Sequence, residues 1–504
     1  MTLRERLDGW LNPVMVKELR QAVRGRFIVT VLSLSLLAQV VAVGAFMLTG
    51  AATTTTGITT IGDDTFMTLF FVLFTGTVLF IPLYSGIRMA VERSDTNVDL
   101  LFVTTIKPRT IVIGKMLTTV ALTALLFFAS LPFLVFSYVL RGVDVFTIFF
   151  VLTIAFFSVC SAAIVALFLG CVPATKPFRL LLGILFFGLV LMGFGGMAAL
   201  ITQIIRSSTT AMFLTSDFWT AVIATAVVVG AIDVMLLVTT TVIITPAAAN
   251  RAFPIRMMIS LIWLASLAVS ARLAFKHRTG HPMVAWTIVQ FLLITIVLCS
   301  VVGERERWGP RVARMIPRNP LKRAIAFLFF SGAGGGVLWA ALFFGATVAL
   351  YEVVQRTRPP SLGSEKILES RVLAEAAICF FVYLLTALLL RRKVLHRIPP
   401  RATWAVGLCI FLLVAVIPPL IFLAGSDKTP DLQERYNLVT ILNPFPFLEG
   451  TGHPARLPIL MLWLLVVSVL SVPWIGEQWR AFKPMRARED GDEDVLQVQE
   501  GTAA

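Results

Sequence analysis

The chain has 504 residues, of which 58% are hydrophobic and only 14% are charged. A soluble chain is typically about 45–50% apolar and about 25% charged, so this composition excludes an ordinary soluble enzyme. The 43 Lys and Arg residues outnumber the 28 Asp and Glu residues. They lie in short segments between apolar runs, as in a membrane protein, which argues against nucleic acid as the partner.

Twelve apolar runs predict membrane spans, because roughly 20 apolar residues cross the hydrocarbon layer. In chain order they are 27–48, 66–86, 116–139, 146–171, 180–204, 218–244, 257–271, 283–302, 327–351, 372–390, 403–424 and 457–476. Most of the Lys and Arg residues lie in the alternate connections that share a side with both chain ends, which predicts that both termini are cytoplasmic. The expected fold is an all-α integral membrane protein of about 12 spans without a large extracellular domain.

The residues before the first span predict an amphipathic helix on the inner membrane surface. Asn12 can cap this helix, and Pro13 suits its first turn. An apolar face and a basic face follow at helical spacing. The apolar face is Met15, Val16, Leu19, Ala22 and Val23, and the other face is Lys17, Arg20, Gln21 and Arg24. The alternative is a plain basic anchor that fixes the topology.

The loop between the second and third spans, 87–115, carries another amphipathic segment. Ser94 or Asp95 can cap a short helix that runs to about Thr105, and Pro108 then ends it. Its apolar stripe is Val98, Leu101, Phe102 and Thr105. A stripe on a cytoplasmic loop needs a partner groove or the membrane surface to cover it, so docking to a protein and a surface-lying connector are both open.

Motifs for catalysis or cofactor binding are scarce. The pair Gly114-Lys115 lacks the other residues of a phosphate-binding P-loop. His277 and His281 are separated by a turn, and no third metal ligand lies near them in the sequence. The sequence therefore predicts that this chain is not an enzyme and binds no cofactor or metal itself.

Two features inside the predicted spans need an explanation. Asp233 is the clearest ionisable residue, and a carboxylate there costs at least ~2.5 kcal/mol, so we expect it to face the bundle interior. It is either a hydrogen-bonding partner of another helix or part of a translocation path. The glycines of 193–196 and 332–336 predict close helix packing.

Together these segments resemble the ABC-2 type transporter permeases over about residues 12–245. The first helix is similar to the family pattern N-P-x-x-x-K-E-L-R, through Asn12, Pro13, Lys17, Glu18 and Arg20. The loop is similar to the pattern E-R … L-L-x-T-x-x-x-P-R … G-K, through Glu92, Arg93, Leu100, Leu101, Thr104 or Thr105, Pro108, Arg109, Gly114 and Lys115. Leu131-Pro132-Phe133 inside the third span is also familiar in the family.

The resemblance implies a permease subunit that works with a dimer of cytoplasmic ATPase subunits, and with a second permease chain or a second copy of this one. The ATPase-docking helix would comprise Glu92, Asp99, Leu100, Leu101, Phe102, Thr104, Thr105 and Pro108. The interfacial helix, with Asn12, Pro13, Lys17, Glu18 and Arg20, would lie close to the ATPase. Short re-entrant helices would lie between the fifth and sixth spans, at Gln203 to Phe218.

The predicted organisation is an interfacial helix at 1–26, a six-span permease domain at 27–244, a second six-span half at 245–476 and an acidic, disordered cytoplasmic tail at 477–504. The second half is a degenerate permease half or an unrelated extension. Glu304 precedes Pro320 by the same spacing as Glu92 precedes Pro108. Segment 303–326 lacks the Leu-Leu pattern, however, and its basic residues would also suit anionic lipid headgroups.

The sequence thus predicts the membrane subunit of an ATP-driven exporter in the cell inner membrane, with ATP hydrolysed by a separate subunit. One alternative is an ATP-independent secondary carrier in which Asp233 binds an ion or proton. The other is a structural membrane anchor of a multiprotein complex. The substrate is not indicated, because apolar helices of this kind serve many classes of molecule.

Overall fold

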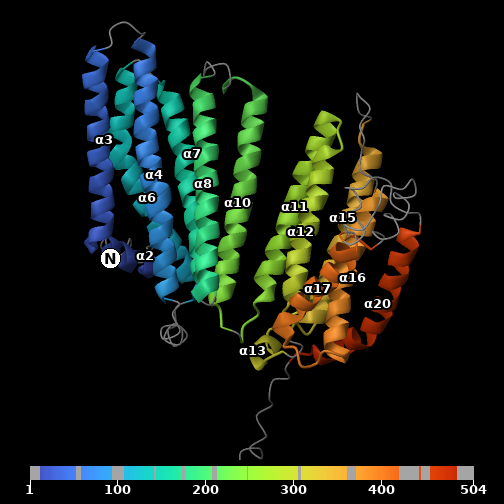
Figure 1. Cartoon of the computed structure of the whole chain (residues 1–504). Helices are drawn as coiled ribbons and strands as arrows, with labels where there is room; N and C mark the ends of the chain where they lie inside the picture. Colours follow the sequence, from blue (N-terminus) through green and yellow to red (C-terminus); the bar gives the residue numbers. More distant parts are fainter. Residues whose placement is uncertain are drawn as a thin grey trace, which may run out of the picture. The chain divides into compact units, whose positions relative to one another are not determined.

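The computed structural model describes residues 12–52, 58–92, 107–140, 143–172, 176–206, 213–246, 248–304, 308–359, 370–418, 420, 442–443 and 455–484. These ranges contain helices and their connections and no strand (Figure 1). Eleven of the described helices are long and apolar enough to cross a membrane. The chain is therefore an all-α, multi-pass membrane protein. It divides into two compact units, Met1–Pro246 and Ala247–Ala504.

Unit 1 is built around α4, which contacts four neighbouring helices, α3, α6, α7 and α8. Its buried face carries Phe66, Phe70 and Phe74, whose rings stack one turn apart. The helices of the unit are α2 (Pro13–Arg24), α3 (Arg26–Ala52), α4 (Ile58–Glu92), α6 (Pro108–Val139), α7 (Val145–Cys171), α8 (Lys176–Arg206) and α10 (Ser216–Ile244). All six spans predicted for this part of the chain coincide with helices that can cross a membrane.

Glycines allow α4 and α7 to approach closely. A Cβ added to Gly170 would lie 2.5 Å from the Gly86 carbonyl oxygen, and one added to Gly86 would lie 3.1 Å from that of Ala166. The predicted close packing at Gly193 and Gly195 is wrong for this unit, because nothing lies within 4 Å of an added Cβ at either position. Those two glycines belong to α8, which buries little of its surface in the unit.

Unit 2 has α12, α15 and α16 at its centre, and these three helices contact one another. Its elements are α11 (Ala252–His277), α12 (His281–Val301), α13 (Pro310–Ala313), α14 (Pro320–Phe329), α15 (Ala333–Thr357), α16 (Ser370–Lys393), η1 (Pro400–Ala402), α17 (Thr403–Phe411), the π-helical η2 (Leu412–Val416) and α20 (Arg456–Ala481). The predicted turn between His277 and His281 is confirmed, since α11 ends and α12 begins at these residues. Only part of the predicted span 403–424 is described, so that span stays a prediction.

The predicted span 327–351 is interrupted at its start. Helix α14 ends at Phe329 and α15 begins at Ala333, and Gly332 between them has φ 154°, a conformation that favours glycine. The Gly334 N–H donates to Gln478 Oε1 at 2.8 Å, and a Cβ on Gly335 would overlap the Phe327 carbonyl. The predicted close packing of this glycine-rich segment is therefore confirmed.

Candidate functional site

Helix α2 begins as predicted and is fixed at once to α6. Asn12 Oδ1 accepts a hydrogen bond from the Val14 N–H at 3.0 Å, and Pro13 occupies the first turn. The Asn12 amide donates to the carbonyl of Thr110, in the first turn of α6, at 2.8 Å. In Figure 1, α2 lies across the ends of the neighbouring helices of unit 1. Asn12 therefore both starts this helix and attaches it.

Lys115 on α6 joins α2 to the end of α4. Its Nζ lies 3.0 Å from Glu18 Oε1 and 2.9 Å from Glu92 Oε2. The Lys115 and Glu18 side chains are each 4% exposed, whereas that of Glu92 is about one-third exposed. A buried ammonium between two carboxylates has its charge compensated on both sides. We call Glu18, Glu92 and Lys115 the ionic triad.

Arg88 and Gln21 extend the contact at the rim of the triad. The Arg88 guanidinium donates to Gln21 Oε1 at 2.8 Å, and its Nε lies 3.8 Å from Glu18 Oε2. Burial of Glu18 opposes its ionisation, but the charge of Lys115 and its hydrogen bond outweigh that effect. The pKa of the Glu18 carboxyl is therefore held below its ordinary value of 4.5.

Gly114 allows α2 to reach Lys115. A Cβ added to Gly114 would lie 2.8 Å from Val14 Cβ and 3.1 Å from Asn12 Nδ2. Any larger residue at this position would push the start of α2 away from α6. The pair Gly114-Lys115 thus has a structural use: the glycine provides a close approach and the lysine provides the ionic contact.

The predicted docking loop joins α4 to α6, two of the three helices that the ionic triad connects. Helix α4 ends at Glu92 and α6 begins at Pro108. The other predicted docking residues lie outside the described residues; they are Asp99, Leu100, Leu101, Phe102, Thr104 and Thr105. The triad therefore holds α2 against both ends of this loop.

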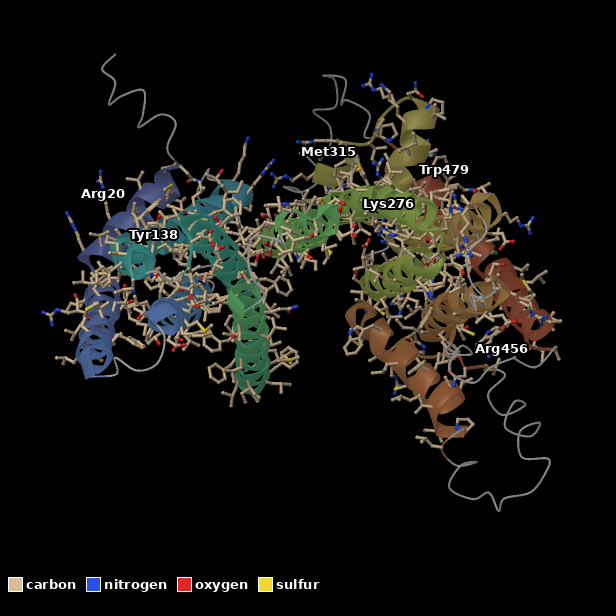
Figure 2. All side chains as sticks on the ribbon, turned by 90° about the horizontal axis from the view of Figure 1, so that it is seen from above. Arg20, Tyr138, Lys276, Met315, Arg456 and Trp479 are labelled. Atoms are coloured by element: carbon tan, nitrogen blue, oxygen red, sulfur yellow. The ribbon has the colours of Figure 1, made fainter. Side chains whose placement is uncertain are left out.

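The two predicted faces of α2 are partly wrong. Glu18 and Ala22 are its buried residues, whereas Val23, predicted on the apolar face, is exposed. Lys17 and Arg20 are exposed, as expected for the basic face (Figure 2 labels Arg20). The helix turns its one acidic residue inward because Lys115 neutralises it there, and a pattern of apolar residues alone cannot indicate this.

Asp233 has a partner on a neighbouring helix. Its Oδ2 accepts a hydrogen bond from Ser161 Oγ at 2.6 Å, which links α10 to α7. The expectation that Asp233 faces the bundle rather than lipid agrees with this contact. Sequence reasoning did not identify Ser161, since a serine in an apolar run is too common to indicate a partner 72 residues away.

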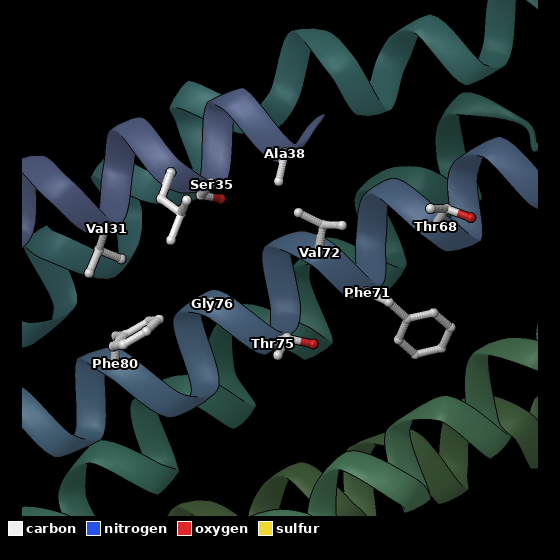
Figure 3. A pocket seen from close by; sticks show the side chains of 10 residues that line it. Val31, Ser35, Ala38, Thr68, Phe71, Val72, Thr75, Gly76 and Phe80 are labelled. Carbon is white, nitrogen blue, oxygen red and sulfur yellow. The ribbon is translucent and has the colours of Figure 1, made fainter. Parts of the chain in front are cut away.

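A groove of about 530 Å³ lies between α3 and α4. Figure 3 shows its lining, with side chains of α3 facing those of α4. The residues are Val31, Leu34, Ser35, Ala38, Thr68, Phe71, Val72, Thr75, Gly76 and Phe80. The walls are apolar apart from three hydroxyl groups, so the groove suits an apolar molecule rather than an ion.

Unit 2 has its own buried ion pair, with a different connection. Arg256 on α11 donates to both Glu304 oxygens, at 2.8 and 2.9 Å, and to the carbonyls of Leu328 and Phe330 at 2.9 and 2.6 Å. Glu92 pairs with Lys115 on α6, the next described helix after it, whereas Glu304 pairs with Arg256 on α11, two helices before it. Glu92 and Glu304 have the same sequence spacing to a following proline, but they do not make equivalent contacts.

Within the described ranges, no group of three or more His, Cys, Asp or Glu side chains is placed to hold a metal ion. A scan of protein-family models and searches of curated proteins and solved structures found no match to this chain.

Proposed function

We propose that the chain is the membrane-spanning subunit of an ATP-driven exporter in the cell inner membrane. It has about 12 spans with both termini in the cytoplasm, and a separate ATPase dimer docks on the loop between α4 and α6. The chain itself binds no nucleotide. Substrate moves outward through the helices of unit 1, which carries the family resemblance.

The observation that carries the proposal is the convergence of residues from the two family-like motifs. Glu18 and Asn12 come from the first motif, and Glu92, Gly114 and Lys115 come from the second. They meet in one buried contact, although Glu18 and Lys115 are 97 residues apart in the chain. An unrelated basic anchor would not need this contact.

The contact suggests how movement of the loop reaches the spans. A force on the loop acts on the end of α4 and the start of α6, and the triad transmits it to α2. Helix α2 continues through Gly25 into α3, so α3 is pulled with it. Helices α3, α4 and α6 would then move together when a docked ATPase closes.

A pull-down in a gentle detergent from native membranes, read by mass spectrometry, tests the proposal. A P-loop ATPase should accompany the wild type and be lost with Leu101→Asp, which places a charge in the predicted docking stripe. The matched control is Leu214→Asp, because Leu214 is 85% exposed and lies in the connection between α8 and α10, three loops further along the chain and on the other side of the spans. Retention of the ATPase by Leu101→Asp would contradict the docking assignment.

A secondary carrier is the second candidate, and it rests on the position of the Asp233 carboxylate inside α10, a helix that can cross a membrane. It predicts uptake or efflux that follows a pH or sodium gradient and is abolished by Asp233→Asn. Wild type that retains its fold but brings down no ATPase would favour this candidate. Recovery of a non-ATPase partner on the loop would instead favour a structural anchor.

A further inference from the structure

The connection between α12 and α15 in unit 2 carries exposed cations. We call residues 308–329, which include α13 and α14, the basic segment. It contains no Asp or Glu. Arg311, Arg314, Arg318 and Lys322 are all exposed. Figure 2 shows nitrogen-tipped side chains projecting outward in this region, near the labelled Met315 and Trp479.

The same segment exposes apolar side chains beside these cations. Ala326 and Phe327 form the buried face of α14, whereas Leu321 and Ile325 are 72% and 53% exposed on its other side. Met315, ahead of this helix, is also exposed. A helix with one face packed on the protein, an apolar outer face and flanking cations is typical of the membrane–water boundary.

The fold of unit 2 fixes the basic segment in one orientation. Phe327 and Phe330 pack on Phe482, which follows α20, and on Trp308. The Arg323 guanidinium stacks over the Trp479 ring at 4.7 Å and donates to the Trp479 carbonyl at 3.1 Å. The outer face therefore cannot turn inward to bury Leu321 and Ile325.

The end of α20 adds to the positive charge of this region. Arg480 and Lys483 are exposed and adjoin Phe482, which lies in the same aromatic cluster. Glu477 on the same helix is exposed and is the one acidic residue of the described range 455–484. The cations of α20 and of the basic segment thus greatly outnumber this one carboxylate.

We propose that the basic segment binds the headgroups of anionic phospholipids. A lipid is the expected ligand because of the connectivity. The basic segment joins α12 to α15, and both helices can cross a membrane, so lipid headgroups are within its reach. Leu321 and Ile325 enter the boundary of the acyl chains, and Arg314, Arg318 and Lys322 bind phosphate. The inference does not depend on the proposed transport function.

Native mass spectrometry of the full chain in detergent tests the proposal, with dioleoyl phosphatidylglycerol and dioleoyl phosphatidylcholine as probes. The test variant combines Arg314→Gln, Arg318→Gln and Lys322→Gln. The control removes the same charge at exposed positions at the end of α11, through Arg272→Gln, Lys276→Gln and Arg278→Gln. Size-exclusion profiles and thermal unfolding verify that both variants are folded.

The wild type should bind phosphatidylglycerol more tightly than phosphatidylcholine. The test variant should lose about 100-fold in affinity for phosphatidylglycerol, because each of the three cations that it lacks contributes roughly fivefold near an anionic surface. The control should retain the wild-type affinity. Equal affinities in the wild type and the test variant, or equal losses in both variants, would overturn the proposal. A further variant, Leu321→Ser with Ile325→Ser, should weaken the binding of both lipids.

Discussion

Lys115 is a buried cation that contacts two carboxylates, so its replacement should be strongly destabilising. Replacing it by methionine removes the ammonium that Glu18 and Glu92 share and leaves the almost fully buried Glu18 with only the more distant Arg88, at 3.8 Å. Breaking a buried pair by removing one partner typically costs about 3–5 kcal/mol. We expect Lys115→Met to release α2, measured as faster amide hydrogen exchange over residues 13–24.

Lys17→Met is the matched control for this substitution. It removes the same charge from an exposed position on α2 itself. Surface changes of this kind usually stay within about 0.5 kcal/mol. Equal exchange rates in Lys115→Met and Lys17→Met would show that the triad does not hold the helix.

Glu18 makes the attachment of α2 sensitive to acid. Its folded-state pKa is below the ordinary value of 4.5, so its contribution to stability is fully present above that value. The contribution is lost as the pH falls through the folded-state pKa. We therefore expect the amide exchange rate of α2, corrected for the intrinsic effect of pH on exchange, to be constant between pH 8 and pH 5. Below about pH 4.5 the corrected rate should increase. In Glu18→Gln this acid step should be missing, and a step of wild-type size in that variant would contradict the assignment.

At the scale of elements, the closest approach of α2 to α6 depends on Gly114. In Gly114→Ala the new Cβ meets Val14 Cβ, the stem of a branched side chain that cannot turn away. We expect a loss of about 1–3 kcal/mol in the free energy of unfolding and weaker protection of α2. Thermal unfolding and hydrogen exchange measure the two effects.

Gly183→Ala on α8 provides the comparison for that prediction. Nothing lies within 4 Å of a Cβ at position 183, so the gain in helix propensity of up to about 1 kcal/mol should be unopposed. If Gly114→Ala were as stable as Gly183→Ala, the tight contact between α2 and α6 would not exist in solution.

The sequence predicted the elements better than it predicted their contacts. The Asn12 cap, Pro13 and eleven of the twelve apolar spans follow local rules, and the structure confirms them as helices or helix starts. The break at Gly332 was missed because 327–351 carries no charged residue. The side chain that donates to the carbonyls at the break, those of Phe330 and Gly332, is Arg256, 76 residues away from Gly332 in the chain. The hydropathy of a run shows where a helix can form but not where a distant side chain interrupts it.

The candidate site was predictable only in part, for the same physical reason. The motifs placed Glu18, Glu92 and Lys115 near functional segments, but the pairing of a buried cation with two carboxylates requires the packing of three helices. Arg88, Gln21 and Ser161 had no signal in the sequence, since each is ordinary in its local context. Their roles come from neighbours that lie far away along the chain.

At the scale of the whole molecule, each unit has a buried ionic contact beside the loop that follows its second span. In unit 1 the contact secures a helix that precedes the first span, and in unit 2 it secures the break between α14 and α15. Charges were expected to lie in the connections, and most do. The buried charged residues are exceptions, and a count of Lys and Arg residues cannot distinguish them from the exposed ones.

The separation of Glu18 and Lys115 also has a consequence for biosynthesis. The chain grows at about 5–20 residues per second, and Lys115 is made 97 residues after Glu18. For some 5–20 seconds the carboxylate has no ammonium to meet, and α2 stays undocked while the first two spans enter the bilayer. The contact therefore cannot form until the first two turns of the third span, which include Lys115, have been synthesised.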